Sequence, residues 1–206
     1  MIALLQNWLR RHIAPENGVP ELSQKEDLNL LNLTGICLNC IAKDLEGFAK
    51  MDVISVCRNQ KKTVRLLSSA KLAIREKFRP EEKTITKHYD CLQDNTAKIS
   101  ATVRLIVTTP ETRLSLATKC ELITLANVFL RLAKNFTSFA KGDSTACKLI
   151  AEVSNADDFV EHLIGEHSEL VRLKDLENDT LVYPYLTLLY HLHFCLKSLK
   201  QIISKS

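Results

Sequence analysis

Hydrophobic residues recur at steps of three and four along most of this 206-residue chain, and the pattern is clearest between Thr109 and Lys141. Thr109 can cap a helix there, Pro110 suits its first turn, and Lys141-Gly142 suits its end. The stretch predicts a helix over 110–141, roughly 45 Å long. Its apolar stripe comprises Leu114, Leu125, Val128, Leu132, Phe136 and Phe139, widened by Leu116, Ile123, Phe129 and Leu130.

Similar stripes predict helices over residues 24–79. Ser23-Gln24-Lys25-Glu26 matches a capping box, and Arg79-Pro80 ends the helical pattern. Gly47 and Met51-Asp52 indicate a break; without it, 24–79 would be one helix roughly 80 Å long. The inward positions are Leu31, Leu38, Ile41, Leu45 and Phe48 before the break, and Val53, Val56, Val64, Leu67, Ala70, Ile74 and Phe78 after it.

The next predicted helix opens at Pro80-Glu81-Glu82 and stops at Thr108-Thr109-Pro110. Its stripe comprises Ile85, Tyr89, Leu92, Ile99, Val103 and Ile106.

The signal weakens after Gly142 and returns near the end of the sequence. Asp143 or Ser144 is expected to cap a short helix through Val153, and Ser154-Asn155 to break it. A second helix over 156–173 would carry Phe159, Leu163 and Leu170 inward. The last predicted helix, 181–204, tolerates Pro184 only in its first turn, and its stripe comprises Tyr185, Leu188, Leu189, Leu192, Leu196, Leu199 and Ile203.

These elements predict an all-α fold. Glycine and proline total only ten residues, and the period-two alternation of strands is nearly absent. Short links make successive helices antiparallel neighbours, so we expect an antiparallel bundle of long helices with up-and-down topology and an additional N-terminal and C-terminal helix. The expected domains are an N-terminal amphipathic segment and loop, 1–22, and a bundle, 23–206, which can divide into two sub-bundles sharing helix 110–141.

The net charge of +4 is mild, but the charges are unevenly placed. Residues 50–87 hold eleven Lys or Arg against four acids, whereas 152–179 hold nine acids against two cations. Arg58, Lys61, Lys62 and Arg65, called the basic face below, would lie together on one side of a helix. They could meet an acidic protein surface or anionic lipid, or simply be solvated. We do not expect nucleic acid as a partner, because interleaved aromatics and a reading module are missing.

Residues 1–14 form a short amphipathic pattern around Trp8, with Arg10 and Arg11 near its end. Such a segment can lie on a membrane, dock onto a partner or pack on its own domain. Since Trp and Arg are enriched at binding hot spots, these three residues are candidate partner contacts, together with the basic face.

Candidate catalytic and metal-binding residues are few. Cys37 and Cys40 form a lone CxxC without a second ligand pair, and buried reduced thiols are the expected state of the seven cysteines. His162 and Glu166 share a helix face from which His167 is rotated away, and the spacing fits no zinc-protease motif. His191 and His193 point to different sides. We therefore expect no enzyme activity, no cofactor and no metal.

Residues 88–165 resemble a helical-bundle segment of the vinculin/α-catenin superfamily. The likeness lies in the TPET turn, the long helix LSLATKCELITLANVFLRLAKNF and the following STACKLIAEVSNADDFVEHL. It implies a non-enzymatic adaptor linked to the actin cytoskeleton or cell junctions, with no functional residue carried over. This chain departs from the pattern because its long helix is less alanine-rich and because the helix after it is expected to break at Ser154-Asn155.

The sequence thus predicts a cytoplasmic adaptor or scaffold that binds other proteins, located at the cell cortex if the resemblance holds. The alternative is a peripheral membrane protein that uses residues 1–14 and the charges of 58–79 on anionic lipid. No stretch approaches the 18 apolar residues of a membrane span. A helical metalloenzyme is the third class, which metal analysis would test.

Overall fold

The computed structural model describes residues 30–77, 83–109, 113–173 and 181–204. Every regular element in these ranges is an α-helix, which confirms the all-α class. The helices are α2 (Leu30–Ala49), α3 (Val53–Lys77), α4 (Lys83–Thr108), α5 (Leu116–Ala140), α6 (Ala146–Leu173) and α7 (Val182–Ile203). The predicted Ser23–Glu26 capping box and the ends assigned to Arg79-Pro80 and Pro80–Glu82 lie outside the described residues.

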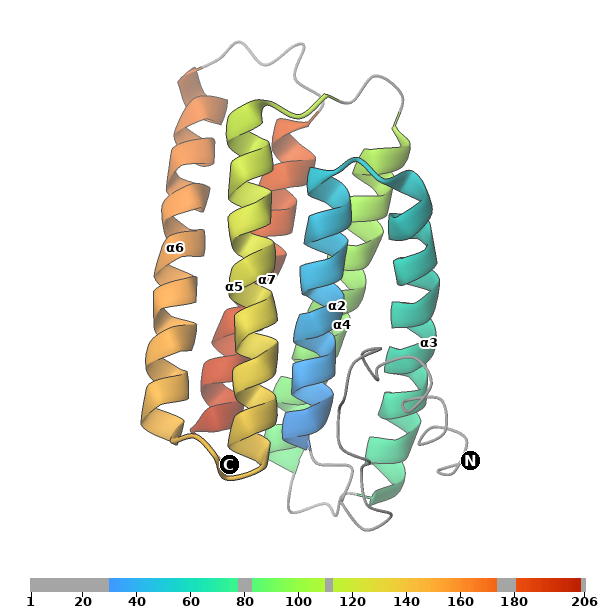
Figure 1. Cartoon of the computed structure of the whole chain (residues 1–206), viewed down its shortest axis with the longest axis vertical. Helices are drawn as coiled ribbons and strands as arrows, with labels where there is room; N and C mark the ends of the chain where they lie inside the picture. The colour runs from blue at the N-terminus through green and yellow to red at the C-terminus, as the bar shows by residue number, and fades with distance from the viewer. Residues whose placement is uncertain (1–29, 78–82, 110–112, 174–180, 205–206) are drawn as a thin grey trace.

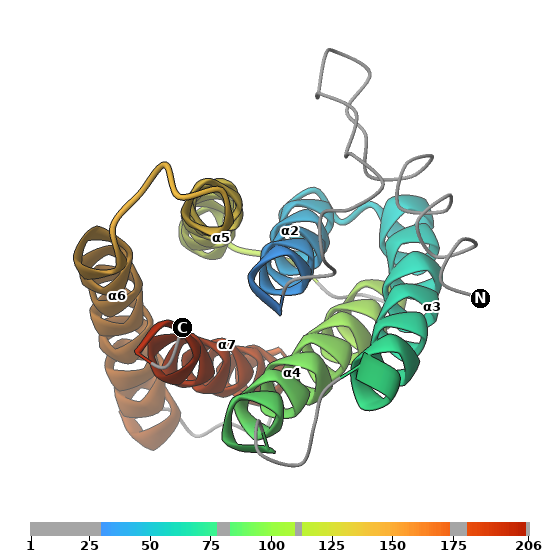
Figure 2. The same cartoon turned by 90° about the horizontal axis from the view of Figure 1, so that it is seen from below.

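The helices lie side by side along the long axis of the molecule (Figure 1). Seen end-on, α3 and α6 lie at the two outer ends, and α2 lies between α5 and α3 (Figure 2). The most extensive contact joins α2 to α5, followed by α4 with α7 and α6 with α7. Neighbours in space are therefore often distant in sequence.

Two glycines allow α2 to approach its neighbours closely. A Cβ on Gly35 would lie 3.2 Å from the Ala133 carbonyl oxygen of α5. A Cβ on Gly47 would lie 2.8 Å from Cγ2 of Val56 in α3, a distance at which an atom must move. Because glycine has no side chain, Gly35 and Gly47 allow α2 to pack this closely against α5 and α3.

A single apolar cluster joins the described helices. The predicted inward positions of α2 and α7 are all buried, as are Tyr89, Leu92, Ile99, Val103 and Ile106 of α4. Five residues of the predicted apolar stripes are instead exposed, because they lie on the solvent side of their helices. They are Val53 and Val64 in α3, and Leu116, Ile123 and Leu130 in α5.

The predicted break between α2 and α3 is confirmed. Met51 has a positive φ of 51°, and the Ser55 amide donates to the Asp52 carboxylate at 3.0 Å, so Asp52 caps α3. The single 80 Å helix is thereby excluded.

The predicted start of the next long helix at Thr109-Pro110 is wrong. Ser115 is the N-cap of α5, and its hydroxyl accepts from the Thr118 amide at 3.0 Å. Thr109 instead donates to the Leu105 carbonyl at the end of α4. The predicted end is confirmed, since Lys141 is the C-cap and Gly142 follows with a φ of 81°.

The predicted break at Ser154-Asn155 is also wrong, because α6 runs unbroken for 28 residues. Polar residues weaken a helix by only a few tenths of a kcal/mol. Burial of Val153 and Ala156 on either side outweighs that cost. The cap is Thr145, whose hydroxyl faces the Lys148 amide at 3.4 Å, rather than Asp143 or Ser144. Pro184 lies in the first turn of α7, as predicted.

Candidate functional site

The basic face lies on α3, where Arg58, Lys61, Lys62 and Arg65 are all exposed. Among the residues that the structure describes, no acid forms an ion pair with Lys61, Lys62 or Arg65. The pKa of the Asp52 carboxyl is lowered mainly by the Ser55 backbone amide, with a smaller contribution from Arg58.

Two further features border the basic face. Arg104 of α4 donates to the Gln60 side chain of α3 at 2.8 Å, which brings another cation beside it. Ile54 and Val64 expose apolar side chains on α3 itself.

Trp8, Arg10 and Arg11 lie outside the described residues, so the structure does not bring them together with α3.

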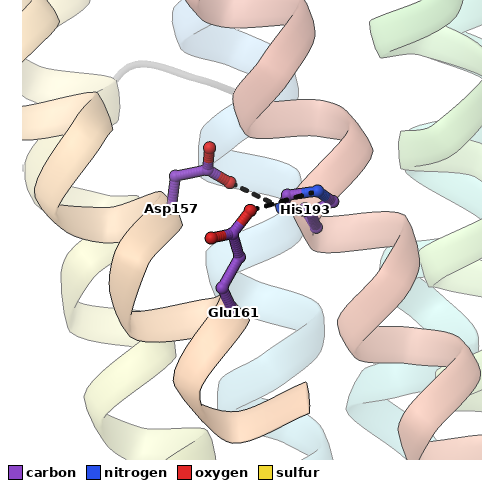
Figure 3. A group of neighbouring side chains, drawn as sticks. All are labelled: Asp157, Glu161 and His193. Carbon is purple, nitrogen blue, oxygen red and sulfur yellow. Dashed lines mark hydrogen bonds and ion pairs between the residues drawn. The ribbon is translucent and has the colours of Figure 1, made fainter. Parts of the chain in front are cut away.

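A second constellation, which the sequence did not predict, joins α6 to α7 (Figure 3). His193 Nδ1 lies 2.7 Å from Asp157 Oδ1, and His193 Nε2 lies 3.6 Å from Glu161 Oε1. Lys200 donates to the other Asp157 oxygen at 2.7 Å. Asp157 is only 3% exposed and His193 8%, whereas the Glu161 side chain is 56% exposed. The group therefore has a buried interior and an open edge.

Helix geometry explains how these residues meet. Asp157 and Glu161 are one turn apart on α6, and α7 packs alongside. His191 projects to the other side of α7, where its ring lies 3.2 Å from Asn95 of α4, as the spacing predicted. Burial, followed by the nearby Lys98, lowers the pKa of His191. The one sequence signal for the constellation was Asp157, an acid placed on the apolar face beside Val153 and Val160.

A third polar group ties α5, α6 and α7 together near one end. The Tyr185 hydroxyl donates to Glu121 Oε2 at 2.8 Å, and His167 Nε2 lies 3.0 Å from the same oxygen. Burial and the Glu121 carboxylate raise the pKa of Tyr185. His167 is directed away from the exposed His162–Glu166 pair, whose closest atoms are 3.4 Å apart, as predicted.

Cys37 is buried against Tyr89 of α4, whereas Cys40, one turn later on α2, is half-buried and lies near Thr63 of α3. Burial is the main cause that raises the pKa of Cys37 to about 12 and that of Cys40 to about 11, which keeps both thiols protonated. The expectation that the cysteines are buried is wrong for Cys91, Cys120 and Cys147, which are exposed free thiols.

Asp44, one turn beyond Cys40, is fully buried on α2. Among the residues that the structure describes, neither of its carboxylate oxygens, nor the nearby Ser100 hydroxyl, has a hydrogen-bond partner. Desolvation raises the pKa of Asp44 to about 7, although Ser100 is close enough to oppose the rise.

No known family profile matches this sequence, and neither the curated proteins nor the solved structures contain a match. The likeness to the vinculin/α-catenin superfamily stays a prediction. In the part of the chain that the structure describes, no helix combines the length and apolar character needed to cross a bilayer.

Proposed function

We propose that this chain is a non-enzymatic, antiparallel up-and-down helical bundle that binds an acidic surface of another protein through the basic face. The observation that supports the proposal is the exposure of four cations on α3, three of which have no acidic partner among the described residues. Uncompensated charge of one sign speeds the encounter with a surface of opposite sign.

The surroundings of the basic face favour a protein partner. Ile54 lies one turn before Arg58, and Val64 lies between Lys61 and Arg65, so apolar side chains interrupt the charges. Interfaces gain affinity where apolar contacts exclude water around a few charged residues. Because α3 lies at an outer end of the bundle, a partner can reach this surface without displacing another helix (Figure 2).

The proposed setting is the cytoplasmic side of the cell cortex, with a partner from the actin cytoskeleton or a cell junction. This part of the proposal rests on the superfamily resemblance of residues 88–165.

Charge reversal on the basic face tests the proposal. The variant Arg58→Glu/Lys62→Glu/Arg65→Glu is compared with Lys119→Glu/Arg131→Glu/Lys134→Glu, which reverses three exposed cations on α5. Quantitative affinity purification from cells is expected to lose specific partners with the α3 variant and retain them with the α5 variant. A partner recovered from the wild type should also be released by moderate salt, because exposed charge pairs are screened.

Equal recovery of every partner by the two variants would contradict a role for the basic face. Vesicle co-sedimentation with both variants, and with residues 1–14 deleted, tests the alternative of lipid binding. Binding to anionic but not neutral vesicles, lost on reversal of the α3 charges, would replace the protein partner with a membrane surface.

A further inference from the structure

The geometry points to a divalent metal site at Asp157, Glu161 and His193, suited to zinc, between α6 and α7. These residues can each supply one ligand atom, and the three atoms lie within 4.8 Å of one another. This inference is independent of the basic face, which lies on α3.

The three candidate ligand atoms lie near one another but not yet at the spacing of a bound ion. Two ligands at about 2.0–2.1 Å from a tetrahedral zinc ion are roughly 3.3 Å apart. The 2.7 Å contact with Asp157 uses His193 Nδ1 and the 3.6 Å contact with Glu161 uses His193 Nε2, and one ion can bind only one of these nitrogens. With one ligand atom from each residue, the three atoms lie within 4.8 Å of one another, so side-chain rotations would bring them around the ion.

The arrangement is also held in place before any ion enters. Asp157 and His193 are at least nine-tenths buried, so neighbouring side chains restrict their rotamers. Lys200 donates to Asp157 Oδ2 and leaves Oδ1 directed toward the histidine ring. Hydrogen bonds of this kind orient metal-binding carboxylates. The exposed side chain of Glu161 leaves a path for the ion from solvent.

Charge and ligand type indicate the class of ion. Two carboxylates and one ammonium group leave one net negative charge, which a divalent cation more than compensates. An imidazole nitrogen with carboxylate oxygens suits zinc better than calcium or magnesium, which prefer oxygen ligands alone. Three protein ligands leave the fourth tetrahedral position to water. Because the ligands come from both helices, the ion would link α6 to α7.

The test uses the full-length chain after removal of metals with a chelator. Zinc titration by calorimetry is expected to show one saturable site and a rise in the thermal unfolding midpoint. Glu161→Gln and His193→Gln are each expected to weaken zinc binding roughly 10-fold or more. The matched control is His162→Gln/Glu166→Gln, which removes an exposed His–Glu pair from the same helix and is expected to leave affinity unchanged.

Cobalt(II) substitution separates this site from the exposed cysteines. A site of nitrogen and oxygen ligands gives cobalt ligand-field bands without a thiolate charge-transfer band. Because Glu161 is exposed, its glutamine variant is expected to fold normally, which circular dichroism can verify. Wild-type protein without saturable zinc binding, binding unaffected by Glu161→Gln and His193→Gln, or a thiolate band would overturn the proposal.

Discussion

At the scale of single residues, Asp44 is the most unusual group in the core. A buried carboxylate without hydrogen bonds is costly in its charged form, so the folded protein holds the proton that the unfolded chain releases near pH 4. The rise in pKa from 3.8 to about 7 means that ionising Asp44 costs on the order of 4 kcal/mol more in the folded protein than in the unfolded chain.

The sign of the resulting pH dependence follows from linkage. Between pH 4 and 7 the folded state binds more protons at Asp44 than the unfolded state does, so its contribution to stability is complete below about pH 4 and is lost as pH rises through about 7. Asp44→Asn is expected to flatten this decline, as measured by denaturant unfolding at several pH values. The control Asp52→Asn changes a carboxyl whose pKa is lowered rather than raised, so the decline should persist. An unchanged slope in Asp44→Asn would contradict the assignment.

At the scale of elements, the helix ends show which signals in the sequence were reliable. Gly142 lies where a positive φ favours glycine, and Asp52 supplies the side-chain oxygen that caps α3; both ends were predicted. The start of α5 was misplaced because Thr109-Pro110 offers the same cap chemistry as Ser115, which is the residue that caps the helix. The break in α6 was wrong because burial along the helix outweighs local propensity at Ser154 and Asn155.

Two exposed glycines give opposite expectations. No atom of the described residues lies within 4 Å of a Cβ added at Gly142 or Gly165, so backbone conformation is what distinguishes them. Gly142→Ala is expected to lower the unfolding free energy by about 1–2 kcal/mol, since its φ of 81° strains an L-residue. Gly165→Ala, inside α6, is expected to raise it by roughly 0.5–1 kcal/mol. Denaturant titration measures the unfolding free energy of both variants. A change of the same sign in the two would contradict these expectations.

At the scale of the whole molecule, α2 carries a large part of the core because α3, α4 and α5 all pack on it. Leu38 on α2 is fully buried, whereas Leu116 on α5 is 80% exposed. Leu38→Ala is expected to cost about 2–5 kcal/mol and Leu116→Ala less than about 0.5 kcal/mol, by thermal or denaturant unfolding. Similar losses of unfolding free energy in the two variants would mean that another group covers the Leu116 side chain.

The sequence predicted the helical class and the buried faces of α2, α4 and α7, because periodicity reports which side of a helix is apolar. It could not predict which helices would pair. The Asp157–His193 contact spans 36 positions and depends on the packing of α6 against α7. In the sequence, Asp157 alone stands out, as an acid on an apolar helix face, and nothing there links it to a partner. Only the tertiary structure brings it together with His193, Glu161 and Lys200.

The pairing of α2 with α5 also bears on synthesis of the protein. Gly35 lies against Ala133, which the ribosome adds 98 residues later (133 minus 35). At about 5–20 residues per second, the nascent chain waits roughly 5–20 s for that partner. During this interval α2 cannot complete the burial of its apolar surface, whatever contacts it makes with α3 and α4. The packing of α2, on which so much of the core depends, is therefore completed only after α5 has been synthesised.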